Sequence, residues 1–248
     1  MAFGGVQVPR TLLCVNVSHV AALRAGRGGS EPDPVEAATI CAKTGCNSIA
    51  VRLREDRRHI QDRDIIGIRK AIPINGKIYI ETALSREMVD IAKKARPDRV
   101  TIVPEKKEEM TAKGGLDVRK NMLAIRNAIG SLHDHGISVS VFIEPDIETV
   151  ELSRECGADF IEIHTGAYAD AVDKPEIDRQ IELIYKASEH AARIRIKTNA
   201  GYGLNYKNVV PLLHAKELLE LNIGHAIISR SDSVGLSRAV EEMMEILD

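Results

Sequence analysis

The stretch Ser48-Ile-Ala-Val-Arg-Leu-Arg-Glu-Asp-Arg-Arg-His59 changes character abruptly along its length. Up to Val51 it is an apolar run that indicates a buried strand, and beyond that point it carries four arginines, two acids and one histidine. Charge runs of this kind are usually solvated loops whose residues pair with one another. Arg52 and Arg54, however, share one face of an extended chain, and their planar guanidinium groups suit phosphate or carboxylate. We therefore expect an anionic substrate at the carboxyl end of this strand.

Outward from this stretch, apolar strand-like runs alternate with helix-like segments along the whole chain. Strands are expected at residues 12–17, 48–51, 77–81, 99–103, 138–143, 160–164, 195–199 and 221–228. Helices are expected at about 33–41, 62–71, 85–95, a long segment ending near 136, 147–156, 175–192, a segment ending at 213, and 240–247. The glycine-rich basic stretch 24–29 is expected to be a loop.

About eight strand–helix units without a linker predict an α/β fold, a closed (β/α)₈ TIM barrel with a few extra helical segments. The length of 248 residues fits a single domain over 1–248, in which 1–10 is expected to be a poorly ordered N-terminal extension. A doubly wound open sheet is the alternative fold. It normally has fewer strands, and no Gly-x-Gly-x-x-Gly follows the first strand of this chain.

The composition indicates which classes of binding partner and which cellular compartment to expect. A formal net charge of −2, no basic tail and 3% aromatic residues argue against binding to nucleic acid or to anionic membranes. The four cysteines form no Cys-x-x-Cys pair, which predicts reduced, inert thiols. The chain shows no leader-like start and no apolar run long enough to span a bilayer, so we expect a cytoplasmic protein.

The predicted strand ends are unusually polar. In parallel barrels the active site lies at the carboxyl ends of the strands. The residues that follow or end the strands here are Asn16, Ser18, His19, Arg52, Arg54, Glu81, Glu162, His164, Asn199, Asn222 and His225. Taken singly, they allow structural interpretations, such as an ion pair between Glu162 and His164 inside the barrel. Their convergence on one rim indicates a ligand, since buried charges need partners.

Two features of this rim suggest its chemistry. Glu81 has the opposite parity to Ile78 and Ile80, so it is expected to face the barrel interior and to act as the general base. Gly203 and Gly224 follow the last two strands, where barrels commonly bind phosphate through helix-start amides. We expect one phosphate there and a second near the arginine-rich stretch.

No metal or nucleotide is expected. His19, His59, His164 and His225 lie on separate elements, and no carboxylate has metal-motif spacing to a histidine. The chain contains no P-loop and no nucleophile elbow. Acid–base and electrostatic chemistry on small anionic molecules remains.

Several motifs resemble the pyridoxine 5′-phosphate synthase family over almost the full length. They are Asn16-x-Ser18-His19-x-Ala-x-Leu23-Arg24-x-x-Arg27-Gly28, Pro32-Asp33-Pro34, Leu53-Arg-Glu-Asp-Arg-Arg-His59-Ile60-x-Asp62-Arg-Asp64, Val103-Pro-Glu-Lys106, Gly114-Gly-Leu-Asp-Val118, Phe160-Ile-Glu-Ile-His-Thr-Gly166, Asn199-Ala-Gly201 and Leu221-Asn-Ile-Gly-His-Ala-Ile-Ile228. The Arg-Glu-Asp-Arg-Arg-His block is the most specific of these motifs.

The resemblance implies a cofactor-free barrel that assembles as a dimer-based homo-octamer. It implies condensation of 1-deoxy-D-xylulose 5-phosphate with 3-amino-2-oxopropyl phosphate to pyridoxine 5′-phosphate, phosphate and water, in pyridoxal phosphate (vitamin B6) biosynthesis. By matching motifs, Asn16 and Arg27 would contact the amino-ketone phosphate. The deoxyxylulose phosphate would contact Ser18, His19, Arg54, His59 and Thr111. Further substrate groups would contact Gly203, Gly224 and His225, while Glu81 would be a general base and Glu162 would stabilise charge in the transition state.

This chain departs from the family pattern at three positions. Arg52 and Tyr202 stand where the family has catalytic histidines, and Ser18 stands where it usually has aspartate. Arginine stays protonated and can act only electrostatically, whereas a tyrosine can donate a proton to a leaving hydroxyl or phosphate. Two alternatives therefore stay open, a sister enzyme with a changed condensation substrate and a silent barrel that binds phosphorylated metabolites.

Overall fold

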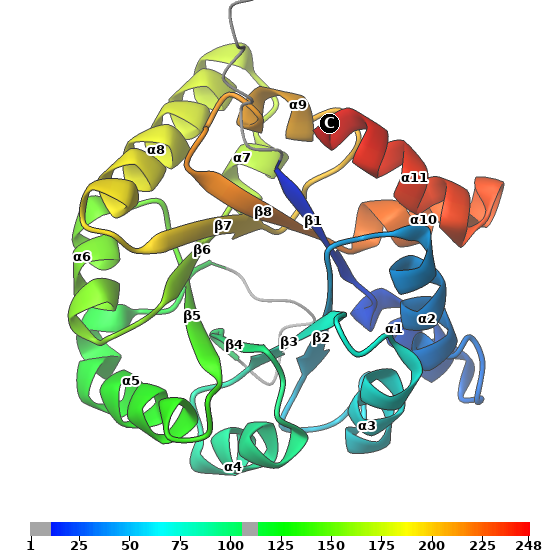
Figure 1. Cartoon of the computed structure of the whole chain (residues 1–248). Helices are drawn as coiled ribbons and strands as arrows, with labels where there is room; N and C mark the ends of the chain where they lie inside the picture. Colours follow the sequence, from blue (N-terminus) through cyan, green and yellow to red (C-terminus); the bar gives the residue numbers. More distant parts are fainter. Residues whose placement is uncertain (1–10, 106–113) are drawn as a thin grey trace, which may run out of the picture.

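The computed structural model describes residues 11–105 and 114–248, and these form a closed barrel of parallel strands (Figure 1). The strands are β1 Leu12–Asn16, β2 Ser48–Leu53, β3 Lys77–Thr82, β4 Arg99–Ile102, β5 Ser138–Ile143, β6 Phe160–His164, β7 Lys197–Gly201 and β8 Leu218–Ile223. Each strand pairs with the next along the chain, and β1 closes the ring against β8. The predicted (β/α)₈ barrel is confirmed.

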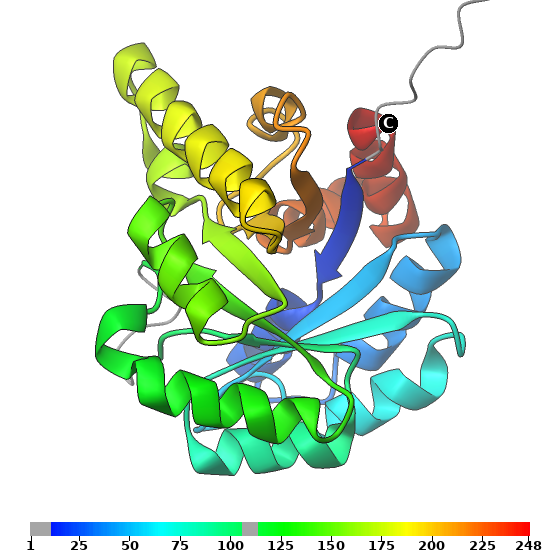
Figure 2. The ribbon, with the colours of Figure 1, turned by 60° about the vertical axis from the view of Figure 1, so that its left-hand side comes forward.

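Helices form a layer outside the strands (Figure 2). They are α1 Ser18–Arg27, α2 Pro34–Thr44, α3 Asp62–Ala71, α4 Arg86–Ala95, α5 Val118–His133, α6 Ile147–Glu155, α7 Gly166–Asp170, α8 Lys174–Arg193, α9 Val209–Leu212, α10 His225–Val234 and α11 Leu236–Leu247. The large apolar core lies between the outward faces of the strands and these helices. In the part of the chain that the structure describes, no helix is both long and apolar enough to cross a membrane.

Local sequence explains where α2 and α3 begin and end. The Asp33 side chain accepts a hydrogen bond from the Val35 backbone N–H, and Gly45 ends α2 with a φ of +107°. The α3 helix is capped by Gln61, whose side chain forms a reciprocal capping box with Asp64. The Asp64 carboxylate accepts the hydrogen bond of the Gln61 backbone N–H at 2.9 Å.

The expectation of a loop at 24–29 is also wrong at its start, because α1 continues to Arg27 and ends at Gly28. Arg24 is only 5% exposed and donates two hydrogen bonds to Asp64, at 2.9 and 2.6 Å. Its guanidinium also donates to the His59 carbonyl at 3.0 Å. The composition of this segment suggested a loop. Its helical conformation is instead stabilised by the contact of Arg24 with Asp64, a buried residue 40 positions further along the chain.

The last strand also differs from its prediction. It begins at Leu218 and ends at Ile223, and the apolar residues that follow belong to α10. Ile227 and Ile228 are buried on the inner side of that helix. A short apolar run looks alike in a buried strand and in a buried helix, so periodicity could not separate the two.

A polar layer fills the amino-terminal end of the barrel. Arg99 and Glu220 are 7% and 3% exposed, and their side chains pair at 3.2 Å. The other Glu220 carboxylate oxygen accepts a hydrogen bond from the Ser48 hydroxyl. The Arg99 guanidinium lies over the rings of Tyr79 and Phe160, at 4.1 and 3.6 Å from their centroids. Because it lies at the end opposite to the strand carboxyl termini, this layer serves stability rather than chemistry.

Candidate active site

A cavity of about 520 Å³ opens at the carboxyl ends of the strands. Its lining includes the predicted site residues Asn16, Ser18, His19, Arg52, Arg54, His59, Glu81, Glu162, Tyr202, Gly203, Gly224 and His225. The polar strand ends thus converge on one rim, as the barrel topology requires. In the described ranges, no cluster of three or more His, Cys, Asp or Glu could hold a metal ion.

Three predicted site residues that the structure describes, Arg27, His164 and Asn199, are not part of the cavity lining. Arg27 is the last residue of α1, where it is exposed and outside the cavity lining. Thr111 lies outside the described residues, as does the expected extension 1–10.

Two carboxyl groups, those of Glu81 and Glu162, line the cavity. Glu81 Oε1 accepts hydrogen bonds from the side-chain amides of Asn16 and Asn222, each at 2.7 Å. The Asn222 amide also donates to Glu162 Oε1 at 3.0 Å. The predicted orientation of Glu81 is confirmed, because Ile78 and Ile80 pack into the outer core while Glu81 lines the cavity.

The environment of Glu162 favours its protonated form. Burial, reinforced by the nearby Glu81 carboxylate, raises the pKa of Glu162 to about 8. Hydrogen bonding from Asn222 opposes this shift without cancelling it. At neutral pH the pair therefore offers an acid at Glu162, beside a carboxyl group on β3 that is less buried.

Two histidines of the rim, His19 and His59, have pKa values that their surroundings lower. Burial and the neighbouring His225 and His59 lower the pKa of His19 to about 4. The rings of His19 and His225 lie 5.3 Å apart. Burial, followed by the Arg58 and Arg54 charges, also lowers the pKa of His59. Neutral imidazoles can both donate and accept hydrogen bonds, and this suits hydroxyl or phosphate oxygens.

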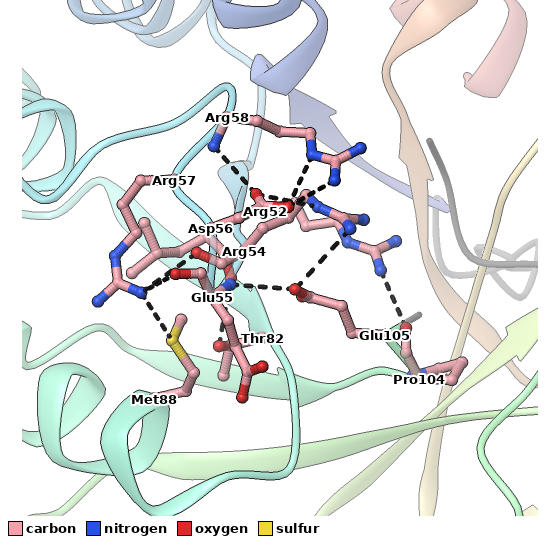
Figure 3. Close-up of polar contacts among 11 residues, drawn as sticks. Arg52, Arg54, Glu55, Asp56, Arg57, Arg58, Thr82, Met88, Pro104 and Glu105 are labelled. Carbon is pink, nitrogen blue, oxygen red and sulfur yellow. Dashed lines mark hydrogen bonds and ion pairs between the residues drawn. The ribbon is translucent and has the colours of Figure 1, made fainter. Parts of the chain in front are cut away.

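The arginine-rich stretch divides into two parts (Figure 3). Arg58 pairs with Asp56 inside the stretch at 2.6 Å, as the self-paired loop interpretation expects, whereas Arg57 pairs at 2.6 Å with Glu87 on α4. Arg54 is 2% exposed and lines the cavity, and its guanidinium lies 3.5 Å from Asp56 and 3.9 Å from Glu105.

Arg52 lies opposite Glu81 in the register of β2 and β3. Its guanidinium donates to the Pro104 carbonyl at 2.9 Å, while its backbone N–H donates to the Ser18 hydroxyl at 2.7 Å. Burial lowers the pKa of Arg52, and the Glu81 carboxylate opposes that shift. Arg52 thus places a fixed positive charge beside Glu81.

Tyr202 reaches the cavity from a strained backbone with a φ of +87°. Its ring lies 4.8 Å from the ring of His164, and the His164 Nδ1 atom lies 2.8 Å from Glu144 Oε1. An ion pair between Glu162 and His164, the alternative raised from the sequence, is therefore wrong. Glu144 was not among the predicted residues, although it directly follows β5 just as the other rim residues follow their strands.

Close packing explains the rim glycines. A Cβ atom on Gly224 would lie 2.9 Å from both the Asn16 carbonyl and His19 Nδ1. Gly203 has a φ of +74°, and a Cβ atom there would lie 2.5 Å from that of Ala169. Gly224 also precedes α10, whose first residues His225 and Ala226 line the cavity, and a helix start of this kind can bind an anion through its N–H groups.

Comparisons with known proteins agree on one family. Residues 13–248 match the family described as "Pyridoxal phosphate biosynthesis protein PdxJ". The pyridoxine 5′-phosphate synthase of Pelobacter propionicus is 48% identical over 235 residues, which cover 95% of this chain and 98% of that protein. The enzyme of the same name from Geobacter sulfurreducens is 47% identical with the same coverage. Thiamine phosphate pyrophosphorylase from Pyrococcus furiosus shares the fold alone, with a TM-score of 0.63 and 16% identity over 96% of this chain and 95% of that one.

Proposed function

The chain belongs to the family of pyridoxal phosphate biosynthesis protein PdxJ, and we propose that it acts as a pyridoxine 5′-phosphate synthase. It condenses 1-deoxy-D-xylulose 5-phosphate with 3-amino-2-oxopropyl phosphate, and the products are pyridoxine 5′-phosphate, phosphate and water. The observation that carries this proposal is the pair of carboxyl groups, Glu81 and Glu162, bridged by Asn222 in a cavity that arginine and histidine also line. Joining an amine to a ketone and expelling water requires a base and an acid, and the two phosphorylated substrates require cations or N–H donors to bind them.

We assign the proton transfers to the carboxyl groups and the phosphates to the rim. Glu81 is the base, Arg54 and His59 bind one phosphate, and the N–H groups at the start of α10, with Gly203, bind the other. Asn16, Ser18, His19 and His225 contact the remaining polar groups of the substrates. Arg27 and Thr111 stay candidates from the family motif alone.

The three departures from the family motif fit this division of roles. Arg52 stabilises developing negative charge on an enolate or phosphate oxygen, because it lies beside Glu81 and keeps its own charge. Tyr202 donates a proton to the leaving phosphate, whereas the carboxyl groups carry out the other proton transfers. The Ser18 hydroxyl accepts a hydrogen bond from the Arg52 backbone N–H, and this contact holds the end of β2 against the start of α1.

The direct test supplies purified protein with both substrates and follows product absorbance together with phosphate release. Turnover supports the proposal, and binding without turnover contradicts it. Arg52→His and Tyr202→His, made singly and together, separate the alternatives. A double variant that gains activity absent from the wild type would identify the wild type as a sister enzyme or a silent barrel.

Arg54→Ala is expected to raise the dissociation constant of the deoxyxylulose phosphate at least about tenfold. A charge-assisted hydrogen bond contributes roughly 1.5–3 kcal/mol, and the buried Arg54 side chain lines the cavity. Isothermal titration calorimetry checks this value, and Arg58→Ala provides a matched control on the solvated part of the same stretch. An unchanged constant in Arg54→Ala rules out the assignment.

We further propose a dimer-based homo-octamer in the cytoplasm, as the family resemblance implies. Phosphorylated metabolites do not cross membranes freely, so an enzyme that uses them works where they are made. Light scattering on the purified protein measures the mass directly, and a monomer at micromolar concentration contradicts the assembly.

A further inference from the structure

We propose that Asn222 is a positioning residue that holds Glu81 and Glu162 together as one acid–base unit, in which Glu81 accepts protons and Glu162 donates them. This inference rests on the proposed function and deepens it. The family motif offers Glu162 only as a group that stabilises charge, and it gives Asn222 no role.

The geometry singles out one side chain. The two N–H groups of the Asn222 amide serve the two carboxyl groups, Glu81 Oε1 at 2.7 Å and Glu162 Oε1 at 3.0 Å. Among the described residues, Asn222 alone has hydrogen bonds to both carboxyl groups. Its Oδ1 atom is buried and has no hydrogen-bond partner within the described part of the chain. The amide is therefore oriented by the carboxyl groups, because the flipped amide would turn its oxygen towards their oxygens.

The barrel wall is shaped to allow this bridge. Asn222 on β8 is in register with Gly201 on β7, and the strand beyond β7 carries Glu162. A Cβ atom on Gly201 would lie 2.8 Å from Glu162 Oε1 and 3.0 Å from the Asn222 Cβ. A glycine at this position therefore leaves the space through which Asn222 reaches across the intervening strand.

The arrangement links the two proton transfers. While Glu81 is ionised, its charge helps to keep the Glu162 carboxyl protonated. When Glu81 takes a proton from the substrate, that repulsion disappears and the pKa of Glu162 falls, so Glu162 becomes a stronger acid. The substrate oxygen that leaves as water accepts the Glu162 proton, and Glu81 retains the one removed from the substrate. One proton enters the pair and one leaves it.

An amide suits this position because it can neither gain nor lose a proton at these pH values. It fixes the distance between the carboxyl groups without letting a proton pass directly from one to the other. A carboxylate there would add a third negative charge, and an apolar side chain would leave the carboxyl oxygens without donors.

Steady-state pH profiles of Asn222→Ala and of the matched variant Asn16→Ala test the inference. Both amides donate to the same Glu81 oxygen at 2.7 Å, but only Asn222 also donates to Glu162. In Asn222→Ala we expect kcat to fall roughly tenfold or more, since misplacement by about 1 Å can slow a reaction about 100-fold. The basic limb, set by Glu162 near pH 8 in the wild type, is expected to move to higher pH, because a hydrogen bond that favours the charged form is lost.

In Asn16→Ala the basic limb is expected to stay at its wild-type position. Equal movement in both variants, or no movement in Asn222→Ala, would overturn the proposal. Gly201→Ala keeps every donor but narrows the gap that the bridge uses, so it should move the basic limb as well. That variant also covers the case in which Asn222→Ala does not fold.

A measurement without substrate separates this inference from the proposed function. Infrared difference titration of the free protein should show one protonated carboxyl band that disappears near pH 8, is absent in Glu162→Gln and shifts in Asn222→Ala. Protein that shows these bands but does not turn over the two substrates would keep the carboxyl unit and refute the proposed function. Protein that turns over the two substrates but lacks the Glu162 band would support the proposed function and refute the carboxyl unit.

Discussion

Glu81→Gln is expected to lower kcat by about 10²–10⁴-fold, because general base catalysis typically contributes that factor. The variant keeps the size of the side chain and one oxygen to accept hydrogen bonds, but it cannot take a proton. Glu81 lines the cavity, lies opposite Arg52 in the sheet register, and receives two amide hydrogen bonds that fix its position. Among the described residues of the cavity, His19 is a weak base because its pKa is lowered to about 4, and Glu162 is protonated at neutral pH.

Single-turnover kinetics with both substrates bound would report this loss directly. Glu87→Gln is a suitable control, because the Glu87 side chain lies on the outer helix α4, is 64% exposed, and pairs with Arg57 outside the cavity lining. The control should keep wild-type turnover. If Glu81→Gln keeps more than about a tenth of the wild-type rate, Glu81 is not the base.

Glu220→Gln is expected to lower the free energy of unfolding by about 3–5 kcal/mol, the usual effect of removing one partner of a buried ion pair. The loss leaves the Arg99 cation inside the barrel without its anion. The rings of Tyr79 and Phe160 still contact the guanidinium, but a cation–π contact contributes only about 0.5–2 kcal/mol.

Urea denaturation would measure this change as a lower midpoint with an unchanged m-value. The double variant Arg99→Met/Glu220→Leu is the informative control, because apolar replacement of a whole buried pair is often neutral or stabilising. It should recover most of the stability that Glu220→Gln loses. A loss below about 1 kcal/mol in Glu220→Gln would mean that water or another group compensates the buried charge.

Local physics was sufficient to predict the architecture. Strand-length apolar runs alternating with helix-length segments determine a parallel sheet, and the number of such units in 248 residues closes it into a barrel. Parity along a strand placed Glu81 inside, because successive side chains of a strand point to opposite faces. The Asp33 cap and the Gly45 terminus of α2 followed from interactions within a few residues.

Other features depended on groups far apart in the chain. Arg24 belongs to a helix because it pairs with Asp64, and His164 pairs with Glu144 rather than with Glu162 two residues away. Asn222 forms hydrogen bonds with Glu81, which lies 141 positions away in the sequence, and with Glu162, which lies 60 positions away.

The sequence by itself therefore determined the barrel, the parallel direction of its strands and the set of polar residues at their carboxyl ends, because these follow from periodicity and connectivity. Only the tertiary structure decided which carboxyl group is the acid. The raised pKa of Glu162 arises from burial and from the nearby Glu81 charge, and both depend on how the strands pack around the barrel. Desolvation and charge–charge distance are properties of the folded molecule, and no local pattern of residues encodes them.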